Sequence, residues 1–277
     1  MAAPGTDEYY RIKRARRALA RDGEINHDTG GRLKGALFAV LAVAAPVVAS
    51  ALIVAVAPAP APPEERSRFA ENLGTTLPET LGVLQAQFAD EFPGLERRYR
   101  RIAAAAASEA AAREEAAEMI RELRRRNASF LLFAPDSALK TAIEHYIALL
   151  TAVRQREDRR ACNAMAIAGP GAFSEITIQP YTGHLDRAGA ALLTAISEGR
   201  AAGLIRERTV ADDWAGVRAA LLDSGAGEDS LAVLAATDRT DIRYCDAAVA
   251  FLSELLAAEG VTGVRARAAF VAEIGKS

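Results

Sequence analysis

Ser137 and Lys140 are the residues whose types and spacing most directly suggest chemistry. They stand three positions apart in the stretch APDSALK, residues 134–140. On a helix, a lysine at this spacing lies one turn beyond the serine on the same face and can take up its proton. Serine enzymes that form an acyl intermediate use this arrangement. The pair is therefore the candidate catalytic element, and a cell-wall-directed acyl-serine hydrolase is the alternative function.

The companion motifs of such enzymes do not accompany this pair. Penicillin-binding proteins and β-lactamases also carry a Ser-Asp-Asn or Tyr-x-Asn element and a Lys-Thr-Gly strand, whereas the nearest equivalent of the strand motif here is Tyr-Thr-Gly at 181–183. Helix initiation explains the residues without further parts, because Pro135 ends an extended segment and Asp136 or Ser137 caps the helix. Lys140 then lies in the first turns, so we expect a helix start and not a catalytic serine.

Cys162 and Cys245 are the two cysteines of the chain. Both follow the apolar run described below, which would place them in an oxidising compartment, and we predict that they form one disulfide. Closing a loop of about 84 residues contributes on the order of 4 kcal/mol in the chain-entropy model. The alternative is two buried thiols that pack as small apolar residues. A redox-active pair is not expected, because the sequence has no Cys-x-x-Cys.

Metal, cofactor and nucleic-acid sites find little support in the sequence. The histidines are His27, His145 and His184, and neither His-x-x-x-His nor Cys-x-x-Cys occurs. We expect His145 and His184 to be interfacial or exposed helix residues. The phosphate-binding glycine patterns are also missing. With 34 basic and 36 acidic residues, the chain has no charge surplus for nucleic acid, so we predict no metal, no cofactor and no nucleic-acid partner.

The apolar run from Gly35 to Ala57 is the most specific signal in the chain. It has 23 residues and carries no charge. A helix of this length covers roughly 34 Å, enough for a hydrocarbon core of about 30 Å, and membrane helices tolerate a proline such as Pro46. A cleaved signal peptide ending at 55–57 is the alternative, but the preceding leader of 34 residues is too long. We predict an uncleaved transmembrane helix over 35–57.

The basic residues around this run predict its orientation. Eight lysines and arginines lie between residues 11 and 34, whereas the near downstream flank offers Arg66 and Arg68. By the positive-inside rule, residues 1–34 form a cytoplasmic tail. The alanine- and arginine-rich composition suggests a bacterium. We therefore expect a single-pass inner-membrane protein whose C-terminal part is periplasmic, with PAPAPPEE at 58–65 as an extended spacer.

The remaining part, residues 66–277, has the apolar spacing of helices. Four stripes at intervals of three and four residues carry this prediction: Leu139, Ile143, Ile147, Leu150 and Val153; Ile242, Cys245, Val249, Leu252 and Leu256; Leu185, Ala188, Leu192 and Ile196; and Trp214, Val217 and Leu221. Prolines and glycines stand between the stripes, as expected at helix ends. The fold class is therefore all-α, a bundle-like domain of several helices.

Three local features complete the predicted domain. Residues 95–126 are rich in alanine, and we expect one long helix that lies on the bundle and ends in a solvated arginine cluster at 124–126. Thr209 is the expected N-cap of the helix that bears Trp214. The irregular stretch at 169–180, GPGAFSEITIQP, has a short extended piece around Ile176 and Ile178 and is the first place to look for a binding surface.

These predictions together favour a binding protein. The expected protein is a membrane-anchored periplasmic helical binding or scaffold protein, an accessory component of an envelope assembly. Its partners would be the lipid bilayer, through residues 35–57, and an envelope protein. A small-ligand sensor is a weaker third class, because the 34-residue tail holds no recognisable output domain.

Overall fold

The regular structure of this chain is helical wherever it is described. The computed structural model describes residues 68–106, 109–169, 173, 178–204, 206–207, 209–225, 227–236 and 241–276. Within these ranges every element is an α-helix or a 3-10 helix. The all-α prediction is therefore confirmed for this part of the chain.

The predicted tail (1–34), span (35–57) and spacer (58–65) lie outside the described residues. No helix inside the described ranges combines the length and the apolar character that crossing a bilayer requires. The helices that are described all belong to one compact unit.

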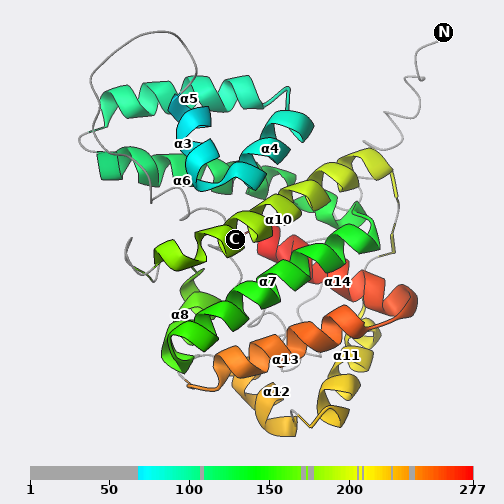
Figure 1. Cartoon of the computed structure of the whole chain (residues 1–277). Coiled ribbons are helices and arrows are strands. Elements are labelled where there is room, and N and C mark those ends of the chain that lie inside the picture. Colours follow the sequence, from blue (N-terminus) through cyan, green and yellow to red (C-terminus); the bar gives the residue numbers. More distant parts are fainter. Residues whose placement is uncertain are drawn as a thin grey trace, which may run out of the picture. The chain divides into compact units, whose positions relative to one another are not determined.

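The first four helices pack together as one layer (Figure 1). They are α3 (Arg68–Thr76), α4 (Pro78–Gln87), α5 (Phe92–Ala105) and α6 (Glu109–Asn127). The single long helix predicted over 95–126 is wrong, because the chain leaves helical geometry at Ala106 and folds back as α6. Leu95 and Tyr99 on α5 are buried in the same core as Leu123 on α6. Burying these side chains together favours the hairpin over the continuous helix that alanine propensity predicts.

The middle of the chain supplies the two longest helices. This segment comprises η3 (Ala128–Phe133), α7 (Asp136–Arg156), α8 (Arg159–Ala168), η5 (Gln179–Tyr181) and α10 (Thr182–Ala202). Helices α7 and α10 pack along each other, and α10 also contacts α4 and η3. At the contact with η3, a Cβ added to Gly199 would lie 2.1 Å from the carbonyl oxygen of Phe130. Only glycine permits this approach of the two backbones.

Four helices at the C-terminal end close the core. They are α11 (Ala211–Asp223), α12 (Gly227–Ala235), α13 (Tyr244–Ala257) and α14 (Gly260–Lys276). Helix α13 lies beside α7, on the side opposite α10 in Figure 1, and α14 packs against η3, α7 and α11. α7 is therefore the central element, flanked by α10 and α13.

Burial follows the predicted stripes closely in α7 and α10 and less closely in α13. Ile147 of the α7 stripe and Trp214 of the α11 stripe are only partly buried. In α13 the prediction was wrong at its start, because Ile242 precedes the helix and is 46% exposed. Ala248 and Leu255 are buried where Val249 and Leu256 were expected. The apolar spacing of the sequence continues across the start of α13 at Tyr244, and this continuation shifts the predicted buried face.

Two predicted helix caps are also corrected. The N-cap of α11 is Val210 and not Thr209, whose hydroxyl instead donates to the carbonyl of Arg265 at 3.0 Å. The carboxylate of Asp213 reaches back and accepts the Val210 N–H at 2.9 Å. At α7 the N-cap is Pro135, with no side-chain cap, so neither Asp136 nor Ser137 has the capping role. In both cases, a residue that the local sequence motif predicts as the cap instead forms a polar contact with a residue far away in the sequence.

Candidate functional site

Asp136, the first residue of α7, has a structural partner in place of the capping role. It accepts two hydrogen bonds from Arg267, Nε to Oδ1 at 2.7 Å and Nη2 to Oδ2 at 2.9 Å. The Arg267 side chain is 1% exposed, and its Nη1 donates to the carbonyls of Leu255 and Ala258 at the end of α13. This buried guanidinium therefore joins α14 to the start of α7 and the end of α13 through charge-assisted bonds.

The predicted catalytic pair lies on the first turns of α7 next to this contact. Ser137 is exposed. The Lys140 ammonium is 3.6 Å from Oδ2 of Asp136, an ion pair between residues four apart. A lysine that activates a serine must lie within hydrogen-bond reach of its hydroxyl, whereas the ion-pair partner of Lys140 is the Asp136 carboxylate. The observed pairing of Lys140 is the one expected of a helix start.

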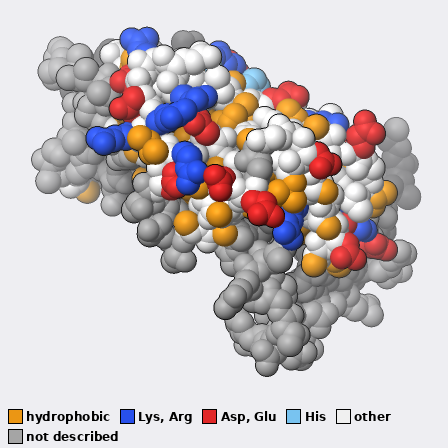
Figure 2. Space-filling model, turned by 90° about the horizontal axis from the view of Figure 1, so that it is seen from below, with side chains coloured by type: hydrophobic (Ala, Val, Ile, Leu, Met, Phe, Trp, Pro, Cys, Tyr) orange, Lys and Arg blue, Asp and Glu red, His pale blue; other side chains and the backbone are white. Residues whose placement is uncertain are grey.

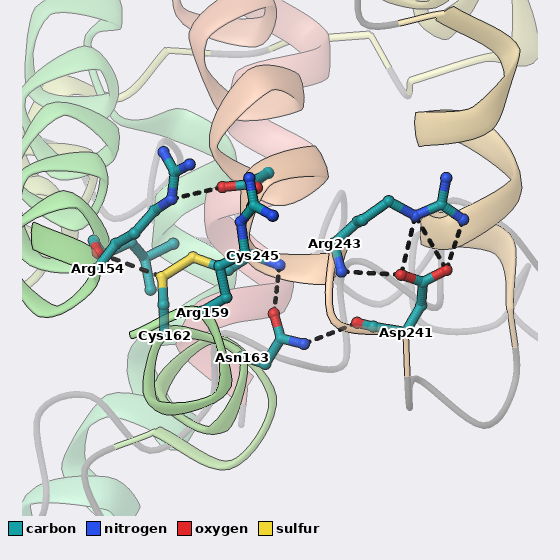
Figure 3. A network of polar contacts seen from close by, with 9 residues as sticks. Arg154, Arg159, Cys162, Asn163, Asp241, Arg243 and Cys245 are labelled. Carbon is teal, nitrogen blue, oxygen red and sulfur yellow. Dashed lines mark hydrogen bonds and ion pairs between the residues drawn. A yellow bond between two sulfur atoms is a disulfide. The ribbon is translucent and has the colours of Figure 1, made fainter. Parts of the chain in front are cut away.

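Cys162 and Cys245 are brought together as predicted. They form a disulfide with Cα atoms 5.7 Å apart, and both are fully buried (Figure 3). Cys162 lies on α8 and Cys245 in the first turn of α13. The bond therefore fastens α8 to the start of α13.

Asn163 reinforces this joint through two hydrogen bonds of 2.7 Å. Its side-chain oxygen accepts the backbone N–H of Cys245, and its amide donates to the carbonyl of Asp241 (Figure 3). Asp246 holds a second contact between the elements, with Arg154 of α7 at 2.7 Å and Arg159 of α8 at 3.1 Å. The Asn163 amide is fully engaged in these contacts, and Asp246 is held by ion pairs, although its buried Oδ1 accepts no hydrogen bond from a described residue. The cluster therefore stabilises the corner between α7, α8 and α13.

Neither His145 nor His184 is part of a metal cluster in the described ranges, where no group of three or more potential ligands occurs. His184 is partly buried, and its Nδ1 is 3.5 Å from Nη2 of Arg187. Burial, followed by the charges of Arg187 and His145, lowers the pKa of His184. The ring is therefore neutral at pH 7.

A shallow groove of about 420 Å³ runs over the outer face of α7. We call it the α7 groove, and its lining comprises Glu144, Ile147, Ala148, Thr151, Ala152 and Gln155 of α7, His184 of α10 and Leu256 of α13. The six α7 residues follow one another at helical spacing, over about 17 Å of helix. Half of the eight lining residues are apolar, and polar groups are supplied by Glu144, Thr151, Gln155 and His184. Concave surfaces of mixed apolar and polar lining are common at binding sites, so the α7 groove is the candidate binding site.

The irregular stretch predicted as a binding surface is described only in part. Residues 170–172 and 174–177 lie outside the described ranges, and so does the expected extended backbone at Ile176. At Ile178 the prediction was wrong, because its backbone is helical (φ −81°, ψ −25°) and its side chain is 2% exposed. Ile178 and Tyr181 join the core, so this end of the stretch contributes packing.

Sequence reasoning missed several polar residues that hold the helices in place. Asp186 of α10 is 3% exposed, and its two oxygens accept the N–H groups of Glu79 and Thr80 at 2.9 and 2.8 Å. Arg124, predicted to be solvated, is fully buried and donates to the carbonyl of Gly275 at 3.2 Å. Burial lowers the pKa of Arg124 to about 10. No local signal marks either residue, because Asp186 stands beside Arg187 and Arg124 begins a run of three arginines.

On the face at the lower edge of Figure 1, positive and negative side chains lie among one another, with hydrophobic atoms between them (Figure 2). Arg154 pairs with Asp246, and Arg243 pairs with Asp229 and Asp241. These ion pairs are examples of such neighbouring opposite charges.

Comparisons with known proteins assign this chain to no group. A scan against protein-family models, a search of curated proteins and a search of solved structures each found no match. The assignment of function therefore depends on the α7 groove and on the sequence.

Proposed function

We propose that this protein is a membrane-anchored, periplasmic helical protein that binds a helix of an envelope protein, as an accessory or scaffold component of an envelope assembly. The α7 groove is the observation that carries the binding part of this proposal. The membrane part rests on the apolar run at 35–57 and on the charge asymmetry around it.

The shape and composition of the α7 groove favour a helical partner. Its length of about 17 Å along α7 corresponds to three turns of a bound helix. Ile147, Ala148 and Ala152 give an apolar floor on which a second helix can lie closely, because two of the three side chains are alanine. An amphipathic helix presenting apolar residues at intervals of three and four is the partner type that such grooves bind.

The polar groups of the α7 groove would orient the bound helix. Glu144 is exposed and would pair with a lysine or arginine at one end of the bound helix. His184 is neutral at pH 7, since its pKa is lowered, and offers a hydrogen bond without a second charge. The charge of the groove lining is therefore negative, and a basic amphipathic helix is the better match.

Site-specific photocrosslinking in intact cells tests this proposal. A photoreactive amino acid at Ala148, which is exposed in the α7 groove, should capture one reproducible envelope protein. The same amino acid at Ala219, exposed on α11, is the matched control. Thr151→Arg places a bulky cation in the groove and should abolish the capture. An equal yield of the same protein from positions 148 and 219, or no capture at 148, would contradict the proposal.

The alternative, an acyl-serine hydrolase that uses Ser137 and Lys140, is less well supported because Lys140 pairs with Asp136. Its test is a cell-wall hydrolysis assay of the wild type against Ser137→Ala. An activity that the substitution leaves unchanged would remove this site from consideration.

A further inference from the structure

Helix α5 carries an outward face of arginines that form no ion pair with the described residues. Its 14 residues include four arginines and one glutamate. Leu95 and Tyr99 turn one side of the helix into the core. Arg97, Arg100 and Arg101 are exposed on the other side, at the helical spacing that also places Pro93 and Ala104 there. We call these five residues the α5 arginine face.

The partners of the four arginines divide them into two kinds. Arg98 forms an ion pair with Glu122 of α6, which joins the two helices of the hairpin. Arg97, Arg100 and Arg101 form no ion pair with any described residue. On α6, Glu118 is occupied by Arg121 and Arg125. Three guanidinium groups therefore point outward from one helix, and no described residue forms an ion pair with them.

The place of α5 in the fold links this face to the membrane. Helix α3 begins at Arg68 and packs on α4 and α5. Only ten residues, 58–67, separate α3 from the end of the apolar run at Ala57. A chain of that length spans at most about 35 Å when fully extended. If 35–57 crosses the bilayer, the layer of α3 to α6 is held within reach of the lipid headgroups.

We propose that the α5 arginine face docks on anionic lipid headgroups of the membrane that holds the anchor. Guanidinium groups bind phosphate oxygens in pairs of parallel hydrogen bonds. Pro93 and Ala104, the small residues of the face, let the helix lie close to the headgroup plane. This inference rests on the anchor of the proposed function and is independent of the α7 groove. Docking through α5 would fix which side of the domain faces the membrane.

The strength expected of this contact follows from the number of arginines. Each basic residue near an anionic surface raises the partition toward it about fivefold, so three give about a hundredfold. The contact should weaken as salt increases, because it is electrostatic. Replacing the arginines by lysines should retain most of it, whereas replacing them by glutamines should abolish it.

The test uses the full-length chain in nanodiscs that carry a headgroup-linked acceptor dye, with a donor dye on Ala104→Cys. Both native cysteines are in the disulfide, so the donor is placed at one position. Discs of neutral phosphatidylcholine are compared with discs that contain phosphatidylglycerol. We expect higher energy transfer on the anionic discs, lost in high salt and in R97Q/R100Q/R101Q but kept in R97K/R100K/R101K.

A matched variant controls for net charge. R156Q/R160Q/R218Q removes the same charge from exposed arginines elsewhere on the domain and should leave the energy transfer unchanged. Equal transfer on neutral and anionic discs, or an equal loss in both glutamine variants, would overturn the inference. So would binding of a DNA duplex that R97Q/R100Q/R101Q abolishes while the lipid signal does not respond, since the face would then belong to nucleic acid.

The experiment distinguishes an absence of the membrane anchor from an absence of lipid binding by the α5 arginine face. Retention of the chain on neutral discs reports the anchor, and the difference between disc types reports the face. A chain retained only on anionic discs, with salt-sensitive transfer, would support the face and contradict the anchor. A chain retained on neither would contradict both.

Discussion

The carboxylate of Asp186 caps a helix that lies 106 residues away in the sequence, and its removal should destabilise the fold strongly. Helix α4 begins at Pro78, and its N-cap residue, Leu77, has no side-chain acceptor. The N–H groups of the next two residues would be left without an intrahelical acceptor. Asp186 accepts both, that of Glu79 at Oδ2 and that of Thr80 at Oδ1. Asp186→Ala would leave the buried Thr80 N–H unsatisfied.

The magnitude follows from the two bonds. A hydrogen bond to a charged acceptor contributes about 1.5 kcal/mol or more, so the loss of two gives about 3 kcal/mol. With a urea dependence of about 2 kcal/mol per molar, the unfolding midpoint falls by about 1.5 M. Asp186→Asn retains one acceptor oxygen and should show about half of this change. Glu198→Ala, at an exposed position of the same helix, is the control and should change the midpoint little.

Two measurements check this prediction on the full-length protein. Circular dichroism at increasing urea gives the midpoint, and hydrogen exchange gives the protection of the amides of Glu79 and Thr80. Both should decrease in Asp186→Ala. If the amides remain protected and the midpoint moves no further than in Glu198→Ala, then α4 does not depend on this carboxylate and the reasoning is refuted.

Two further predictions concern packing and acid stability. Gly199→Ala should cost several kcal/mol, since the added Cβ would meet the Phe130 carbonyl oxygen at 2.1 Å; a thermal midpoint equal to that of Gly216→Ala, where no atom lies within 4 Å, would contradict this. Although burial opposes ionisation of Asp213, the Arg265 guanidinium and the Val210 N–H lower the pKa of its carboxyl below 3.8. The stabilisation is present above the unfolded pKa and is lost as the pH falls through the lowered folded value. Urea titrations at pH 5 and pH 3 should therefore show a smaller loss of stability for Asp213→Asn than for the wild type, and equal losses would refute it.

The helical class and much of the core could be predicted because they depend on local patterns. The stripe from Leu139 to Val153 repeats at the period of a helix, and this period decides which side of α7 is buried. The pairing of Cys162 with Cys245 was predictable for another reason, since the chain has two cysteines and the topology predicted from the sequence would place them in an oxidising compartment. Neither inference required knowledge of how the helices pack.

The features that were predicted wrongly depend on contacts between residues far apart in the sequence. In the alanine-rich stretch, Ser108 before Glu109 is the one residue typical of a helix start, and the reversal itself is favoured by burial of Leu95 and Tyr99 in the same core as α6. Arg124 was expected in solvent as part of an arginine run. It is buried because the carbonyl of Gly275 accepts its hydrogen bond, and a cation suits the negative end of α14.

The polar residues of the candidate site divide in the same way. The Ser-x-x-Lys spacing and the i, i+4 pair of Asp136 with Lys140 are both visible in the sequence, whereas the contact of Asp136 with Arg267, 131 residues away, is not. The α7 groove has no local signal, because α10 and α13 contribute to it at His184 and Leu256. A groove of this kind is a property of packing.

The central claim is that the helical domain lies outside the cytoplasm, held by an anchor at 35–57. The most direct test is the state of Cys162 and Cys245 in intact cells, read by mass spectrometry of their peptides with and without reduction after treatment with a membrane-impermeant thiol reagent. The account predicts that the two peptides are linked and become reactive only after reduction. Two free thiols that react only once the membrane is opened would contradict it and would place the domain on the cytoplasmic side.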